Sequence, residues 1–243
     1  IGQYLDLGVE MDRAVRANRE KACLSACFTW LIRMGETGVK VNPCIGVKRN
    51  RETKRTRYVT HEEYEAVRAV ATKQLRAVLD LIYRTLQRPD DIITWKHSNL
   101  VSKTEADGTV KRIIRTKPSK TESRTGITID IEITPQIEQI LKDLRGDVIK
   151  FGTLIQNGQG KPYTYDGLTT MLTRAIAKAG VPSFGMRDLK GKGATDMFYI
   201  EKKDLREIQA LCGHASMKTT EIYIKKHWTE TITPNKTNTE KAS

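Results

Sequence analysis

The side chains in this chain that could do chemistry are mostly cations, accompanied by a histidine and a tyrosine. In chain order the candidates are Arg88, Lys120 (with Lys117 as the alternative), Arg187, Lys190, His214 and Tyr223. Cations can neutralise the non-bridging oxygens of a phosphodiester while a hydroxyl attacks phosphorus and another group protonates the leaving oxygen. The sequence shows no convincing Asp/Glu cluster for Mg²⁺. These residue types therefore indicate phosphodiester chemistry that uses a side-chain nucleophile.

Taken singly, each candidate has an ordinary structural explanation. A tyrosine on a helix, such as Tyr223, is more often a half-buried packing residue, and His214 could be a helix cap. Arg88 could form only an ion pair, and Lys120 could be a solvated residue at a hairpin tip. The hypothesis rests on the order of the residues and on the spacing of nine between His214 and Tyr223.

The net charge points to a polyanionic partner. The 243 residues include 42 Lys and Arg against 29 Asp and Glu, which gives a formal net charge of +13 and a pI of about 9.6. Nucleic acid is the first partner to expect for such a chain. Aromatic residues make up only 6%, which disfavours a base-stacking platform for single strands.

The cysteines and the apolar runs bear on the compartment. Cys23, Cys27, Cys44 and Cys212 are too few and too scattered for a disulfide framework or a zinc finger, which favours a reducing, cytoplasmic setting. No apolar run approaches the roughly 18 residues of a membrane span. Residues 1–10 lack the features of a secretory signal, and we expect Ile1 to be a cut end because no Met precedes it.

The first quarter of the chain reads as a helix followed by a basic stretch. Apolar periodicity predicts a helix from Arg13 to Met34, ended by Gly35. Its apolar stripe consists of Cys23, Cys27, Trp30, Leu31 and Met34. Residues 51–59 are predicted to be a basic linker between domains, either solvated or lying on phosphates as a strap.

The rest of the chain combines many helices with one small sheet. Thr60 and Glu63 form a capping box at the start of a helix. The next helix carries an apolar face of Leu75, Val78, Leu79, Ile82 and Leu86. Isoleucines alternate with polar residues from Ile127 to Thr134, a strand whose expected partner is Val110 to Arg115.

Further helices are predicted after this hairpin. They start at Pro135, cover residues 168–179, 189–199 and 204–211, and include a last one that begins after Ser216. Gly191 and Gly193 are expected to permit close helix packing. The expected fold class is mainly α (α+β), a helical domain with a small antiparallel sheet.

Several short motifs, taken together, resemble those of the tyrosine recombinase (phage integrase) family. They are Gln87-Arg88-Pro89-Asp90-Asp91, Arg187-Asp188-Leu189-Lys190, Leu211-Cys212-Gly213-His214, and Tyr223 nine residues after the histidine. The resemblance covers residues 60–228, which it assigns to a catalytic domain. Residues 1–50 look like a partial helical core-binding domain, and 229–243 are a polar tail.

The resemblance assigns a role to each candidate. Arg88 falls in the position of the first arginine, and Asp91 in the acidic position that supports it. Lys120, or alternatively Lys117, matches the hairpin lysine. His214 matches the second His/Trp position and Tyr223 the nucleophile. Leu86 stands where many members have Gly.

One motif departs from the family pattern. Where members have His-x-x-Arg, this chain has Arg187 and Lys190. Lysine keeps the charge but cannot offer a phosphate the two-pronged contact of arginine. Arg187 has too high a pKa to act as a general base at neutral pH, so we expect it to add positive charge instead.

The resemblance implies a site-specific recombinase or integrase that acts through a 3′-phosphotyrosyl intermediate, without metal, ATP or another cofactor. It implies double-stranded DNA attachment sites as partners, a homotetramer on DNA and DNA-bending accessory proteins. The element moved would be a prophage or a genomic island. Two alternatives stay open: a nicking-closing enzyme like a type IB topoisomerase, and a DNA-binding regulator with a weakened active site.

Overall fold

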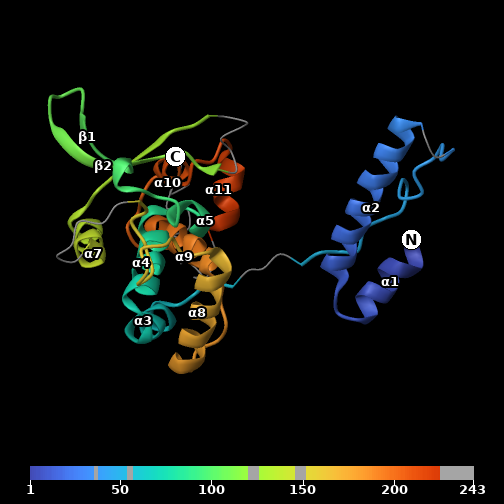
Figure 1. The fold of residues 1–243 in the computed structure, drawn as a ribbon, viewed down its shortest axis with the longest axis horizontal. Coiled ribbons are helices and arrows are strands. Elements are labelled where there is room, and N and C mark those ends of the chain that lie inside the picture. The colour runs from blue at the N-terminus through green and yellow to red at the C-terminus, as the bar shows by residue number, and fades with distance from the viewer. Residues whose placement is uncertain (36–37, 54–56, 120–125, 146–151, 225–243) are drawn as a thin grey trace, which may run out of the picture. The chain divides into compact units, whose positions relative to one another are not determined.

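The computed structural model describes residues 1–243 except 36–37, 54–56, 120–125, 146–151 and 225–243. The chain divides into two compact units, Ile1–Thr56 and Arg57–Ser243 (Figure 1). Each unit is described by itself below.

The first unit contains two helices. They are α1 (Gly2–Glu10) and α2 (Ala14–Met34), which pack against each other. The predicted helix is confirmed as α2, and Gly35 ends it in the left-handed conformation that glycine adopts without strain. The helix α1 was not predicted. Most of the predicted apolar stripe is exposed, including Cys23, Cys27 and Trp30.

The second unit is helical around a small sheet, so the predicted fold class is confirmed. Its elements are α3 (His61–Val70), α4 (Lys73–Thr85), α5 (Pro89–Ile92), the 3₁₀ helix η1 (His97–Asn99), β1 (Leu100–Thr104), β2 (Val110–Thr116), β3 (Ile129–Glu132), α7 (Pro135–Arg145), α8 (Tyr165–Ala179), α9 (Met186–Tyr199), α10 (Leu205–Cys212) and α11 (Met217–Tyr223). The predicted capping box is present at the start of α3.

The sheet has the strand order β1-β2-β3 with both pairs antiparallel. Ile131 lies opposite Ile114, and Ile129 opposite Thr116, which confirms the predicted pairing. The strand itself is shorter than the predicted alternation, because it starts at Ile129 and ends at Glu132. The edge strand β1 was not predicted.

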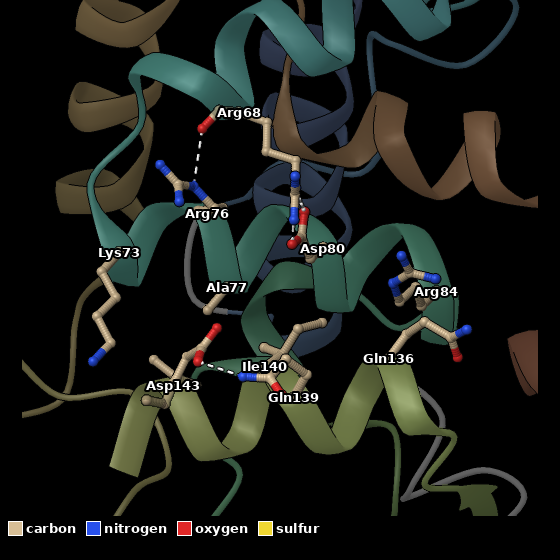
Figure 2. A pocket seen from close by; sticks show the side chains of 11 residues that line it. Arg68, Lys73, Arg76, Ala77, Asp80, Arg84, Gln136, Gln139, Ile140 and Asp143 are labelled. Atoms are coloured by element: carbon tan, nitrogen blue, oxygen red, sulfur yellow. Dashed lines mark hydrogen bonds and ion pairs between the residues drawn. The ribbon is translucent and has the colours of Figure 1, made fainter. Parts of the chain in front are cut away.

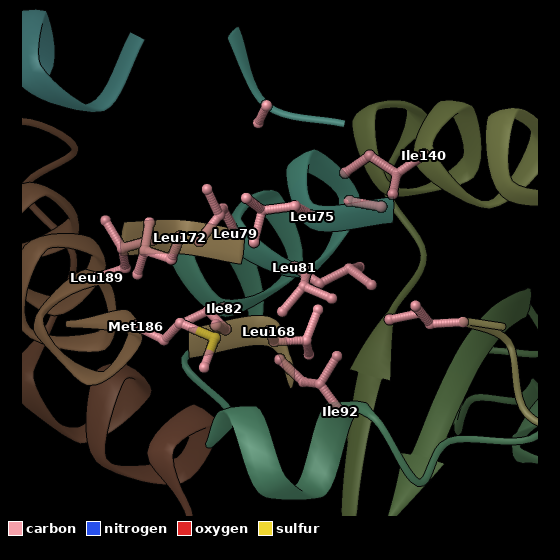
Figure 3. Packing of buried hydrophobic residues seen from close by; sticks show 14 of the residues in the cluster. Leu75, Leu79, Leu81, Ile82, Ile92, Ile140, Leu168, Leu172, Met186 and Leu189 are labelled. Atoms are coloured by element: carbon pink, nitrogen blue, oxygen red, sulfur yellow. The ribbon is translucent and has the colours of Figure 1, made fainter. Parts of the chain in front are cut away.

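Helix α4 forms the centre of the core. Its apolar face contacts α7, α8 and α9. Figure 3 shows Leu75, Leu79 and Ile82 of α4 among side chains of α8 and α9, including Leu168, Leu172, Met186 and Leu189. Burial of each such side chain stabilises the fold by about 2 kcal/mol. This packing fixes the C-terminal end of α4, from which the chain enters the segment that carries Arg88.

The start of the second unit overlaps the stretch 51–59, which the sequence predicted to be a basic linker, either solvated or lying on phosphates. Val59 is fully buried in the core. Arg57 donates hydrogen bonds to the carbonyl oxygens of Pro182 and Ser183, and Tyr58 donates one to Asp196. The last three residues of the predicted stretch 51–59 are therefore held against the second unit.

Helix α9 is enclosed along most of its length, and its glycines allow this. A Cβ on Gly193 would lie 2.2 Å from the carbonyl oxygen of Tyr83 and 2.7 Å from Cδ2 of Leu86. The expected close packing of α9 at Gly193 is therefore present, against the backbone of α4.

Substitution Gly193→Ala is expected to destabilise the chain by about 3 kcal/mol, because the new methyl group meets a backbone atom that cannot rotate away. Urea unfolding followed by circular dichroism measures this loss. Gly158→Ala is the control, because a Cβ there meets nothing within 4 Å. An equal effect of the two substitutions would contradict the packing described here.

Candidate functional site

Three predicted site residues meet in one place: Lys190 of α9, His214 in the loop between α10 and α11, and Tyr223 of α11. The rings of His214 and Tyr223 stack with centroids 5.1 Å apart and planes inclined by 30°. The ammonium nitrogen of Lys190 lies 5.2 Å from the centroid of the Tyr223 ring. The spacing of nine residues thus places the tyrosine directly over the histidine.

The local backbone explains this placement. Helix α10 ends at Cys212, and Gly213 follows in the left-handed conformation with φ +65°. A Cβ on Gly213 would also lie 2.6 Å from Ile129 Cδ1, so the tight turn needs glycine. The chain then places His214 beside α9 and enters α11, of which Tyr223 is the last residue.

His214 is buried and only partly satisfied. Its Nδ1 lies 3.0 Å from the hydroxyl oxygen of Thr220, while its buried Nε2 has no hydrogen-bond partner among the described residues. Burial, followed by the charges of Lys190 and Arg88, lowers the pKa of His214 to about 4. The imidazole is therefore neutral at pH 7 and has one ring nitrogen available.

Lys190 is a buried cation beside the same rings. Its ammonium donates a hydrogen bond of 3.3 Å to the carbonyl oxygen of Cys212. Burial lowers the pKa of Lys190 to about 8; the charge of Arg88 contributes, while Cys212 and Asp91 act in the opposite direction. Because Arg88 lowers the pKa of both Lys190 and His214, these three groups form one electrostatic cluster that an entering anion would stabilise.

Arg88 is held by the turn between α4 and α5. Leu86 ends α4 in the left-handed conformation with φ +54°, which accounts for the glycine that many family members have there. The side chain of buried Gln87 donates a hydrogen bond of 2.5 Å to the carbonyl oxygen of Leu211. Arg88 caps the N-terminus of α5, and its side chain is 18% exposed.

Asp91 connects this turn to the segment after β2. One of its carboxylate oxygens accepts hydrogen bonds from the backbone N–H and the hydroxyl of Ser119, at 3.0 and 2.7 Å. The other lies 3.8 Å from Nη1 of Arg88 and has no hydrogen-bond partner among the described residues. Lys120, the next residue after Ser119, lies outside the described residues, and Lys117 is exposed.

Arg187 lies apart from the stacked rings. Its guanidinium pairs with Asp90 at 3.2 Å and lies over the ring of Tyr165, 5.4 Å from the centroid. The side chain is 68% exposed. The family position of the first histidine is therefore occupied here by a surface cation. This cation pairs with Asp90 of α5, the helix that begins directly after Arg88.

Three supporting residues escaped the sequence reading. Ser119 and Thr220 contact Asp91 and His214 respectively, and Gln87 holds the turn before Arg88 to the carbonyl oxygen of Leu211. Each acts across a turn or between distant segments, so no periodicity marked them. The one signal for them was their place in the sequence, because each lies within a short stretch around Arg88, Lys120 or Tyr223.

The described residues contain neither a candidate metal cluster nor a candidate membrane span. No group of three or more His, Cys, Asp or Glu side chains that could hold a metal ion occurs there. No described helix is long and apolar enough to cross a membrane.

A separate cleft of about 280 Å³ lies where α3 and α4 face α7 (Figure 2). Its lining includes Arg68, Arg76, Arg84 and Asp80, and none of the predicted site residues. Asp80 is already satisfied by Tyr64 and by Arg68, and Arg76 caps carbonyl oxygens at the end of α3. We therefore take the stacked rings, and not this cleft, as the candidate functional site.

The buried state of Lys190 predicts a pH dependence of stability. Between about pH 8 and the ordinary value of 10.5, the unfolded chain holds a proton that the folded chain has lost. Stability should therefore rise with pH across this window, by at most about 3 kcal/mol. This gain is opposed above about pH 9 by Cys212, and above pH 10 by Tyr58, Tyr64 and Tyr83, because burial raises the pKa of each of these groups.

Urea unfolding between pH 7 and 10 checks this, because Lys190→Met should remove the rise and leave the opposing contributions of Cys212 and the tyrosines. Identical pH profiles for the two proteins would contradict a buried, destabilised ammonium at Lys190.

The fold and the site agree with a family match over most of the chain. Residues 57–230 match the sequence pattern described as "Phage integrase family". The chain therefore belongs to the phage integrase family.

Curated relatives are similar over parts of their length. Tyrosine recombinase XerC of Staphylococcus carnosus is 27% identical over 203 residues, which cover 78% of this chain and 64% of that protein. XerC of Herpetosiphon aurantiacus is 36% identical over 90 residues, 36% of this chain and 29% of that protein. The chain thus spans less than two thirds of the length of these two relatives.

Solved structures share the fold. A lambda integrase (75–356) dimer bound to a COC′ core site matches with a TM-score of 0.75 and 20% identity, over 96% of this chain and 81% of that one. The XerH recombinase in a post-cleavage complex with palindromic difH matches with a TM-score of 0.64 and 19% identity, over 93% and 68%.

Proposed function

We propose that this chain is the DNA-cleaving part of a site-specific recombinase that works through a 3′-phosphotyrosyl intermediate. The observation that carries the proposal is the stack of Tyr223 on His214, beside Lys190, with the Nε2 of His214 buried and unpartnered. A phosphate oxygen would supply the missing partner, and the two cations Arg88 and Lys190 would neutralise its charge.

In the proposed reaction, the phenol oxygen of Tyr223 attacks the scissile phosphorus and passes its proton to solvent water. The bond from phosphorus to the 5′ oxygen breaks, and Lys120, or alternatively Lys117, gives that oxygen a proton. Arg88, Lys190 and His214 hold the non-bridging oxygens. The phosphotyrosyl bond preserves the energy of the broken bond, so a 5′ hydroxyl of another strand can reverse the reaction without ATP.

Arg187 has a secondary role in this proposal. A guanidinium does not act as a base in proteins, and that of Arg187 is paired with Asp90, so it cannot take a proton from Tyr223. It adds positive charge at the rim of the site. Lys190, in the position of the family arginine, offers a single ammonium in place of a two-pronged contact.

The partners in the proposal are DNA and further copies of this chain. A lambda integrase tetramer has been solved on a Holliday junction, and we propose a tetramer on two duplex attachment sites here. We further propose that the DNA moved is a mobile element such as a prophage or genomic island, that DNA-bending proteins assist, and that the chain acts in the cytoplasm.

A nicked suicide substrate tests the proposal. A duplex selected by the protein from a random library is synthesised with a nick just beyond the cleaved phosphate, so that the freed fragment diffuses away. The wild-type chain should then accumulate a covalent complex that survives denaturing electrophoresis. A complete absence of this complex would leave only the DNA-binding regulator.

A second assay separates the two enzymes that form this complex. A recombinase exchanges strands between two duplexes, whereas a nicking-closing enzyme relaxes supercoiled DNA without exchange. Exchange between a labelled and an unlabelled duplex supports the proposal, and relaxation alone supports the topoisomerase-like alternative.

A further inference from the structure

Helix α9 carries a second, fully buried lysine that the proposed reaction does not use. Lys192 pairs with Asp196 at 2.9 Å, and these side chains are 0% and 4% exposed. Two tyrosine hydroxyls complete the network: Tyr58 donates to one oxygen of Asp196 at 2.5 Å, and Tyr83 to the other at 2.9 Å. Lys192 also donates to the hydroxyl oxygen of Tyr58 at 3.1 Å.

Such a buried ion pair depends on its neutral partners. Desolvation of the two charges is compensated only when the remaining donors and acceptors find hydrogen bonds. Tyr58 serves both members of the pair, since its hydroxyl contacts Asp196 and Lys192 and its ring lies 4.8 Å from the ammonium. Loss of this single hydroxyl would leave an oxygen of Asp196 without its donor.

The position of Tyr58 in the chain makes this network unusual. Tyr58 is the second residue of the second unit, which begins at Arg57. Arg57 itself binds the carbonyl oxygens of Pro182 and Ser183, in the loop that leads into α9. The first two residues of the unit therefore bind two parts of the chain: Arg57 binds the loop before α9, and Tyr58 binds residues of α9 itself.

The opposite side of α9 faces the functional site. Lys190, two residues before Lys192, reaches Cys212 and the ring of Tyr223. Gly193, the residue after Lys192, lies against the backbone of α4. A shift of α9 toward solvent would therefore move Lys190 relative to Tyr223.

We propose that Tyr58 is a positioning residue for Lys190, because it completes the buried Lys192–Asp196 pair and so holds α9 at the depth that places Lys190 over Tyr223. The consequence for DNA cleavage rests on the proposed function. The consequence for Lys190 itself is a property of the free protein and can be tested without DNA.

The test is an NMR titration of the Lys190 ammonium in the full chain, labelled with ¹⁵N-lysine and assigned by the signal missing in Lys190→Met. The ionisable groups around Lys190 are Arg88, Asp91, Cys212, His214 and Tyr223, and none is altered. Tyr58→Phe should admit water and raise the pKa of Lys190 from about 8 by roughly one unit. Arg57→Gln should shift it in the same direction by less.

Tyr64→Phe is the matched control. Tyr64 is also a buried tyrosine, and it donates a hydrogen bond of 2.5 Å to the carboxylate of Asp80. Asp80 lies on α4 and not on α9. Both tyrosine variants should lose stability, while only Tyr58→Phe should shift the titration of Lys190. An unchanged titration in Tyr58→Phe, or equal shifts in both variants, would overturn the proposal.

Cleavage kinetics give a second readout. With the suicide substrate, Tyr58→Phe should slow formation of the covalent complex about tenfold at saturating DNA, with the Kd for DNA unchanged. If the wild-type chain forms no covalent complex, the proposed function fails, and the NMR comparison still decides the positioning role. Equal losses of rate in Tyr58→Phe and Tyr64→Phe would count against it.

Discussion

Tyr223→Phe is expected to abolish the covalent protein–DNA complex while leaving DNA affinity unchanged. The phenol oxygen is the atom that forms the ester in the proposed reaction, and no other atom of the ring can replace it. Phenylalanine keeps the ring that stacks on His214 and lies under Lys190, so the packing of α11 is retained. No covalent complex should be detectable on a labelled denaturing gel.

Tyr165→Phe is the matched control for this experiment. Tyr165 begins α8 and supports Arg187 with the face of its ring, which phenylalanine preserves. This variant should form the covalent complex at nearly the wild-type rate. A covalent complex that persists in Tyr223→Phe would show that another side chain is the nucleophile.

Arg88→Gln is expected to lower the cleavage rate by roughly 100- to 1,000-fold, which is typical for removal of one group that stabilises charge in the transition state. Glutamine retains much of the side-chain length but removes the charge. Single-turnover kinetics on the suicide substrate measure the rate. Arg84→Gln, an exposed arginine of α4 that lines the separate cleft, should have no comparable effect.

The same variant has a signature that needs no DNA. The charge of Arg88 lowers the pKa values of both Lys190 and His214. In Arg88→Gln both pKa values should therefore rise, which NMR titration can follow. If neither changes, Arg88 does not belong to the electrostatic cluster and the rate loss would need another explanation.

The sequence predicted the elements with strong local signals. The alternation around Ile129 and Ile131 identified the strand, and the Thr60–Glu63 pair marked the start of α3. The fixed spacing of His214 and Tyr223 indicated the stack, because a short turn and one helix separate them. The edge strand β1 gave no such signal, since its side chains do not alternate between apolar and polar.

Contacts between distant segments were beyond prediction from one sequence. Lys192 and Asp196 lie four residues apart and resemble an exposed helical pair, yet small residues let α9 become enclosed and bury both. Arg187 stood in a family position beside the reaction, and only the fold shows that it pairs with Asp90. Asp91 was recognised as a support for Arg88, but its bonds to Ser119 join segments 28 residues apart.

Asp91 has a consequence for how this site can evolve. One carboxylate oxygen serves the backbone and hydroxyl of Ser119, and the other faces Arg88. The effects of substitutions at Arg88, Asp91 and Ser119 should therefore not be additive. Once Asp91 is lost, a further substitution of Arg88 or Ser119 removes fewer interactions. Among related sequences, substitutions at these three positions should therefore co-vary.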